Sequence, residues 1–207
     1  MAIDHAVPNH HAHYPGFAGA TGLIAALSMI VGRGEDAELA ARLTALGPHD
    51  TLVDVGCGPG VAARHAAGLG ASATGVDPAG VMLRVARLLS IRSPRSPAAL
   101  HFVEGIAESL PMGDGTATVL WSIASVHHWD DLDRALGESR RVLAPGGRLL
   151  AIERATVPGA RGHASHGWTQ EQAEQFAARC EAHGFRDARV ETHDGSRRKT
   201  VSVLAQG

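Results

Sequence analysis

Short apolar runs that end in glycine, acidic or turn residues recur along the chain after residue 50. Five of these runs are predicted to be buried β-strands: Thr51–Val55, Ala71–Val76, Leu100–Val103, Thr116–Trp121 and Arg148–Glu153. Two further runs near the C-terminus, Ala188–Thr192 and Thr200–Ala205, bring the predicted set to seven strands. We therefore expect a fold built around a sheet.

Between the strands, apolar residues recur at helical spacing. Four helices are predicted: Val61–Leu69, Val81–Leu89, a face from Leu132 to Ser139 closed by Pro145-Gly146-Gly147, and Thr169 to Gly184. The last of these opens on a capping-box pair, Thr169 and Gln172. Strands that alternate with helices predict an α/β fold whose mostly parallel sheet is covered on both faces.

The residues before the first strand have a different character. A His-rich arm, His5–His13, precedes two predicted helices, Ala20–Val31 and Glu35–Leu46. A chain of 207 residues leaves no room for a second large domain. We expect one domain, with residues 1–47 as the N-terminal arm and helices and residues 48–207 as the core.

Composition and charge exclude several classes of protein. The 44% hydrophobic and 19% charged residues are those of a globular domain, and 19 basic against 21 acidic residues leave no positive field to hold nucleic acid. The apolar run Leu23–Val31 is far shorter than the roughly 20 residues of a membrane span, and the N-terminus lacks the features of a secretory signal. We expect a cytoplasmic protein that binds neither nucleic acid nor membrane, with its two cysteines reduced.

The strongest chemical signal is the turn after the first strand, Asp54-Val-Gly56-Cys57-Gly58-Pro-Gly60. Alternate glycines allow the backbone to approach a ligand, and the helix that follows presents unpaired N–H groups. The second strand is followed by Asp77, where an acid in such folds binds ribose hydroxyls. The alternative is a tight strand-to-helix connection without a ligand. The spacing G-x-G-x-G differs from the dinucleotide fingerprint G-x-G-x-x-G, which disfavours NAD.

Together with four later blocks, this turn resembles the class I S-adenosylmethionine-dependent methyltransferases, in particular the type 11 small-molecule group related to quinone-biosynthesis enzymes. The later blocks are Gly75-Val-Asp77, Glu104-Gly-Ile-Ala-Glu-Ser-Leu-Pro111, Val126-His-His-Trp129 and Arg141-Val-Leu-Ala-Pro-Gly-Gly-Arg-Leu149. The resemblance spans Thr51 to Glu153. It implies a Rossmann-like three-layer sandwich with a seven-stranded mostly parallel sheet, a C-terminal antiparallel hairpin and N-terminal lid helices.

The resemblance also implies a site for S-adenosylmethionine, in which Asp54 anchors the methionine end, Asp77 binds the ribose and Met82 lies against adenine. The implied cofactor residues are Asp54, Gly56, Cys57, Gly58, Gly60, Asp77, Pro78, Met82, Ile106, Ala107, Glu108 and Ser122. Members of the family usually carry Gly-Asp-Ala where this chain has Gly105-Ile106-Ala107. Either Ile106 packs on the adenine ring while a backbone group or Glu108 takes the amine, or adenine recognition is weaker here.

Methyl transfer needs alignment of the two reactants more than it needs a metal or a covalent intermediate, and alignment contributes about 7 to 11 kcal/mol. A nearby imidazole that takes the acceptor's proton adds about 10² to 10⁴ in rate. His127 and His128 follow the fourth strand and are the candidate bases; the alternative is that they serve packing and loop shape. Two more groups are candidates to line the acceptor pocket: His11, His13 and Tyr14, and His163, His166 and Trp168. The first group is equally consistent with a solvated arm.

No metal site is predicted. His10-His11-x-His13 lacks nearby acids or cysteine, and Asp130, Asp131 and Asp133 suit the first turn of a helix better than a cation.

The motifs of amino-directed nucleic-acid and protein methyltransferases, of cytosine C5 enzymes and of arsenite methyltransferases are absent. The expected partner is a small organic substrate, bound by a monomer or a homodimer. A catalytically silent S-adenosylmethionine-binding module and an NAD-dependent oxidoreductase remain as alternatives.

Overall fold

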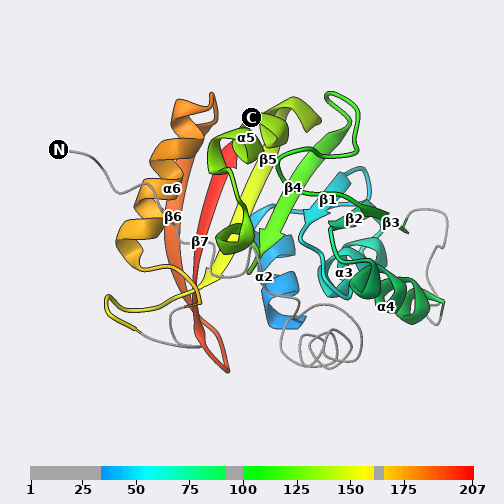
Figure 1. The fold of residues 1–207 in the computed structure, drawn as a ribbon, viewed down its shortest axis with the longest axis horizontal. Coiled ribbons are helices and arrows are strands. Elements are labelled where there is room, and N and C mark those ends of the chain that lie inside the picture. The colour runs from blue at the N-terminus through cyan, green and yellow to red at the C-terminus, as the bar shows by residue number, and fades with distance from the viewer. Residues whose placement is uncertain (1–33, 92–99, 161–165) are drawn as a thin grey trace.

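The computed structural model describes residues 34–91, 100–160 and 166–207. These residues contain one seven-stranded sheet in the order β3-β2-β1-β4-β5-β7-β6 (Figure 1). The strands are β1 Thr51–Val55, β2 Ser72–Asp77, β3 Leu100–Glu104, β4 Ala117–Ile123, β5 Leu143–Arg154, β6 Arg186–Asp194 and β7 Lys199–Gln206. The first five pair in parallel, and β7 runs antiparallel between β5 and β6. The predicted Rossmann-like fold class is confirmed, including its C-terminal hairpin.

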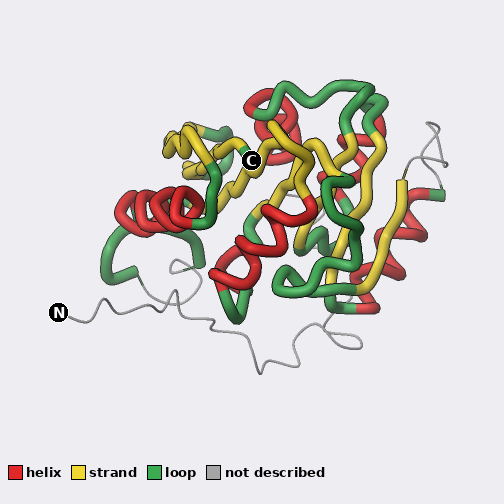
Figure 2. The backbone as a smooth tube through the Cα atoms, turned by 90° about the horizontal axis from the view of Figure 1, so that it is seen from above, coloured by secondary structure: helices red, strands yellow, loops and turns green. Residues whose placement is uncertain are grey.

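Helices cover both faces of the sheet, as the view from above shows (Figure 2). They are α2 Gly34–Leu43, α3 Val61–Gly68, α4 Gly80–Ser90, α5 Leu132–Val142 and α6 Gln170–Ala182, with a short 3₁₀ helix, η3, at Val126–His128. Successive strand residues point to opposite faces, so the sheet has two cores. Leu52 packs with α2, α3 and α4, whereas Val53 packs with α5 and α6. Among the described residues, no helix combines the length and apolar character needed to cross a membrane.

Two helices begin at residues whose side chains cap them. Thr169 Oγ1 accepts the backbone N–H of Gln172 at 3.2 Å while Gln172 Oε1 accepts that of Thr169 at 2.9 Å, so the capping box is confirmed. Asp131 caps α5 by accepting the backbone N–H of Arg134 at 3.0 Å. Asp133, in the first turn of α5, pairs with Arg179 and with His183. The capping interpretation of these acids is therefore confirmed for Asp131.

One predicted boundary is wrong. The segment Pro145-Gly146-Gly147 does not close α5, which ends at Val142; it lies inside β5. The register of β5 against β4 shifts between Ala117 and Val119, and this irregularity accommodates the glycines. Gly146 N–H donates to the carbonyl of Gly207 at 3.1 Å, and the backbone N–H of Gly207 donates back to Gly147 at 2.8 Å. Pairing with the far end of the chain thus makes this turn-like sequence part of the sheet.

A polar network ties the connection between α2 and β1 to the centre of the sheet. Thr118 Oγ1 donates to Asp50 Oδ1 at 2.6 Å, Gly47 N–H donates to Asp50 Oδ2 at 2.8 Å, and Arg148 pairs with the same carboxylate. Burial by itself raises the pKa of Asp50, but the bonds from Thr118 and Gly47 and the charge of Arg148 hold that pKa below its ordinary value. Asp50 is thus stabilised as an anion.

Candidate cofactor and acceptor site

The glycine turn follows β1 and opens α3 at the carboxyl edge of the sheet. Gly56, Gly58 and Gly60 have φ angles of 72°, 52° and 71°, a left-handed region that glycine enters without steric cost. The backbone N–H groups of Gly56 and Cys57 both donate to the carbonyl of Val76, at 2.8 and 3.0 Å. The turn is therefore bound to the end of β2, where Asp77 lies.

Two of the glycines are also required by packing. A Cβ atom added to Gly56 would lie 2.4 Å from Cβ of Ser125, and one added to Gly60 would lie 2.5 Å from Cε1 of Phe102. Ser125 in turn donates to the carbonyl of Val55 at 2.7 Å and shares a 2.6 Å hydrogen bond with Ser122. The turn, the end of β1 and the loop after β4 therefore form one tightly packed unit, in which Ser122 is fully buried.

Asp77 holds the glycine turn from the neighbouring strand. Its Oδ2 accepts the backbone N–H of Gly58 and its Oδ1 that of Ala79, both at 2.8 Å. A carboxylate is an acceptor of the kind that ligand hydroxyls bind. Asp54, the penultimate residue of β1 and two positions before Gly56, is 2% exposed. Two buried carboxylates thus lie close enough to the turn for both to act on Cys57.

The remaining predicted cofactor residues near this turn differ in exposure. Cys57 and Met82 are buried, whereas Pro78 is exposed. Burial, followed by the charges of Asp54 and Asp77, raises the pKa of the Cys57 thiol well above its ordinary value. Cys57 is a free thiol, as is Cys180. The Cys57 side chain therefore acts as a small neutral group beneath the turn.

The block after β3 carries an apolar side chain to the surface. Ile106 is 47% exposed, whereas Ala107 and Glu108 are buried. Glu108 Oε1 accepts the backbone N–H groups of Asp130 and Asp131, at 2.7 and 3.2 Å. Glu108 therefore braces the loop between η3 and α5, and Ile106 is the exposed one of these three predicted cofactor residues.

Three imidazoles gather where β4 ends. Ala124, which follows β4, has a left-handed φ of 51°, and η3 begins two residues later. The ring centroids of His127 and His128 are 4.0 Å apart, and His166, from the segment before α6, lies 6.0 Å from His127. The structure thus brings together residues that were predicted for catalysis and for acceptor binding.

Glu153 belongs to this cluster and was missed by the sequence analysis. It ends the apolar stretch Leu149-Leu-Ala-Ile of β5 and is 1% exposed. Its Oε1 accepts the backbone N–H of Val126 at 3.0 Å, and its Oε2 lies 3.0 Å from Nδ1 of His127. A charged residue at the end of a strand that is otherwise buried was the signal that pointed to it.

Other predicted acceptor residues have different positions. Trp168 is 1% exposed and packs on Phe176 at 4.7 Å between ring centroids, so it belongs to the core beneath α6. His11, His13, Tyr14 and His163 lie outside the described residues. Within the described ranges, no three His, Cys, Asp or Glu side chains are grouped so as to hold a metal ion.

The fold is Rossmann-like, and its glycine turn lies at the carboxyl edge of the parallel strands. Residues 53–151 match the family described as methyltransferase domain. Over these residues the chain is similar to that family, and the resemblance inferred from its motifs is confirmed.

Similar proteins carry methyltransferase names. A malonyl-[acyl-carrier protein] O-methyltransferase of Pectobacterium atrosepticum is 33% identical over 150 residues, covering 71% of this chain and 56% of the relative. A ubiquinone/menaquinone biosynthesis C-methyltransferase of Brucella anthropi is 38% identical over 125 residues, covering 58% of this chain and 46% of the relative. The chain thus spans about half the length of these relatives.

The fold has close structural neighbours as well. The crystal structure of a SAM-dependent methyltransferase from Aquifex aeolicus superposes with a TM-score of 0.69 over 86% of this chain and 97% of that one, at 18% identity. An identity this low supports the shared fold.

The residues present fit S-adenosylmethionine. The glycines of the turn add no side chains that would block a ligand, the Asp77 carboxylate is a hydrogen-bond acceptor of the kind that ribose hydroxyls need, and the exposed Ile106 offers apolar area for a base. No dinucleotide fingerprint follows β1, because the third glycine comes one residue too early.

Proposed function

We propose that this chain transfers a methyl group from S-adenosylmethionine to a small organic acceptor, and that His127 or His128 removes the acceptor's proton. The observation that carries the proposal is the pair of adjacent imidazoles at the end of β4, next to the glycine turn. Bound S-adenosylmethionine would supply an electrophilic methyl group, whose carbon–sulfur bond breaks as the acceptor's lone pair attacks.

The chain's own residues would bind the cofactor, orient the acceptor and remove its proton. The glycine turn, Asp54 and Asp77 would hold the cofactor, and Ile106 would pack on adenine. The imidazole would accept the proton of an O–H, N–H or activated C–H group and later release it to solvent. The two relatives are named for transfer to oxygen and to carbon. A base suits an acceptor that must lose a proton, such as a hydroxyl or an activated C–H group, whereas a carboxylate could attack without one.

The acceptor class, location and assembly belong to the same proposal. The near-neutral charge of the chain argues for a small molecule rather than nucleic acid. We propose that the protein works in the cytoplasm as a monomer or a homodimer. Sedimentation of the purified chain with and without S-adenosylhomocysteine would determine which of the two forms carries the site.

Calorimetry and labelled methyl transfer test the proposal. The purified chain should bind S-adenosylmethionine and S-adenosylhomocysteine but not NAD, and should incorporate labelled methyl into a bacterial small-molecule extract. Binding of NAD alone would refute the methyltransferase assignment. Cofactor binding without any incorporation would favour a catalytically silent binding module.

The two histidines are tested separately. Replacing the responsible residue, His127→Asn or His128→Asn, should lower the rate of label incorporation about 10²-fold or more, while cofactor affinity stays nearly constant. Replacement of the other should have a much smaller effect. If both variants keep the original rate, the imidazoles are structural and methyl transfer relies on alignment alone.

A further inference from the structure

Glu153 combines deep burial with contacts to the predicted catalytic loop. A carboxylate that is 1% exposed is costly unless hydrogen bonds compensate for lost hydration. Both of its oxygens are used, Oε1 by the N–H of Val126 and Oε2 by Nδ1 of His127. In the described part of the chain, His127 is the only basic side chain within hydrogen-bond distance of it. Both carboxylate oxygens of Glu153 therefore bind residues of η3.

We propose that Glu153 is a positioning residue that keeps the proton of the neutral His127 ring on Nδ1 and leaves the Nε2 lone pair for the acceptor's proton. The inference rests on the proposed function and selects His127 from the two candidate bases. An ionised carboxylate only accepts hydrogen bonds, so the 3.0 Å contact requires Nδ1 to be the donor. A neutral imidazole carries one N–H, and Nε2 is then free to accept.

The same contact serves the charged state of the ring. When Nε2 takes the acceptor's proton, the ring becomes an imidazolium, whose positive charge lies next to the Glu153 carboxylate. Since Glu153 is almost completely buried, solvent screens this attraction only weakly. The proton leaves Nε2 for solvent after the methyl group has moved, and the ring returns to its starting tautomer.

Replacement by glutamine separates this role from simple packing. The side-chain amide has nearly the shape of the carboxylate but one oxygen acceptor and one N–H₂ donor. If its oxygen keeps the Val126 N–H, its N–H₂ faces Nδ1 and favours the proton on Nε2, which inactivates the base. If its oxygen faces Nδ1 instead, two donors meet at Val126. Either orientation breaks one of the two bonds.

The first test needs no acceptor. The full chain labelled with ¹⁵N-histidine is examined at pH 8 by long-range ¹H–¹⁵N NMR correlation, and His127 is assigned from the signals lost in His127→Asn. A neutral ring protonated on Nδ1 is expected. A ring protonated on Nε2, which would mean that Glu153 holds the proton, overturns the proposal, and so does an imidazolium. This measurement stands even where a Glu153 variant fails to fold.

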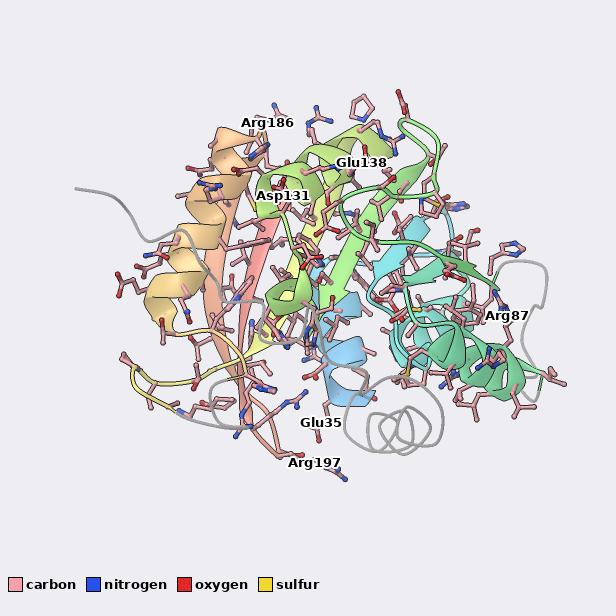
Figure 3. The ribbon with its side chains drawn as sticks, viewed as in Figure 1. Glu35, Arg87, Asp131, Glu138, Arg186 and Arg197 are labelled. Atoms are coloured by element: carbon pink, nitrogen blue, oxygen red, sulfur yellow. The ribbon has the colours of Figure 1, made fainter. Side chains whose placement is uncertain are left out.

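The second test measures rate. Glu153→Gln should lower label incorporation about 10² to 10⁴-fold, the range expected when a histidine base is held in the wrong tautomer, with cofactor affinity by calorimetry unchanged. Glu138→Gln is the matched control, because Glu138 also accepts a backbone N–H, that of Leu110 at 2.9 Å. Glu138 lies toward the end of the sheet opposite to the carboxyl ends of β4 and β5 (Figure 3). The control should keep the original rate.

A double variant separates positioning from structural damage. If Glu153 acts through His127, Glu153→Gln combined with His127→Asn should be no slower than His127→Asn alone. Additive losses, or an original rate in Glu153→Gln alone, overturn the positioning role. If Glu153→Gln and His127→Asn both keep the original rate, the proposed base itself fails, while incorporation of label still supports the methyltransferase.

Discussion

The packing of Gly56 against Ser125 predicts that Gly56→Ala destabilises the protein through two separable effects. The left-handed backbone, with φ of 72°, costs an L-residue about 1 to 2 kcal/mol. The new Cβ would lie 2.4 Å from Cβ of Ser125, and overpacking of this kind costs about 1 to 3 kcal/mol. We expect a total loss of about 2 to 5 kcal/mol in the free energy of unfolding.

Gly146→Ala is the matched control. Gly146 has a similar φ of 76°, but no atom lies within 4 Å of its added Cβ. This variant should lose only the backbone contribution of about 1 to 2 kcal/mol. The difference between the two variants therefore measures the contact with Ser125.

Urea unfolding followed by circular dichroism measures both variants. With an m-value of about 2 kcal/mol/M, a loss of about 3 kcal/mol lowers the midpoint by about 1.5 M. Adding Ser125→Gly to Gly56→Ala should recover part of the loss, although it removes the Ser125 hydroxyl that binds Val55. If Gly56→Ala costs no more than Gly146→Ala, the packing argument is refuted.

Three further predictions concern the cofactor site and the Asp50 network. Asp77→Ala should weaken S-adenosylmethionine binding at least tenfold, because charged hydrogen bonds are worth about 1.5 to 3 kcal/mol each; calorimetry showing an unchanged dissociation constant in a folded variant would remove Asp77 from the site. Ile106→Asp should weaken binding in the same assay, since a carboxylate replaces an apolar contact, whereas a tighter complex would mean that an acid here restores an adenine hydrogen bond. The lowered pKa of Asp50 means that its stabilising contribution is present above the unfolded pKa and is lost as pH falls through the folded one. In Asp50→Asn, the free energy of unfolding measured by urea titration should therefore fall less steeply as the pH is lowered from roughly 5 to 2. An unchanged dependence on pH would contradict this.

Most of the fold was predictable because local patterns specify it. The seven strands and the Thr169 capping box depend on alternation, spacing and side-chain chemistry within a few residues, and they were found where predicted. The glycine turn was recognisable because its residue types follow from backbone geometry. The boundary at Pro145-Gly146-Gly147 was wrong because its outcome depends on pairing with Gly207.

The candidate site was predictable only in part. Asp77 could be placed beside the turn, since the carboxyl ends of neighbouring parallel strands meet. The core position of Trp168 could not be read from its neighbours, because an indole suits a pocket or a core equally well. The exposure of Ile106 likewise follows from how its loop packs.

The sequence by itself determined the order of strands and helices, the glycine turn and the two imidazoles after β4. Only the tertiary structure decided that Glu153 meets His127 and that Ser125 lies against Gly56. These partners come from separate strands and loops, and no local pattern encodes their distance. They meet because the sheet order places β4 between β1 and β5, so that the loop after β4 contacts the ends of both neighbours.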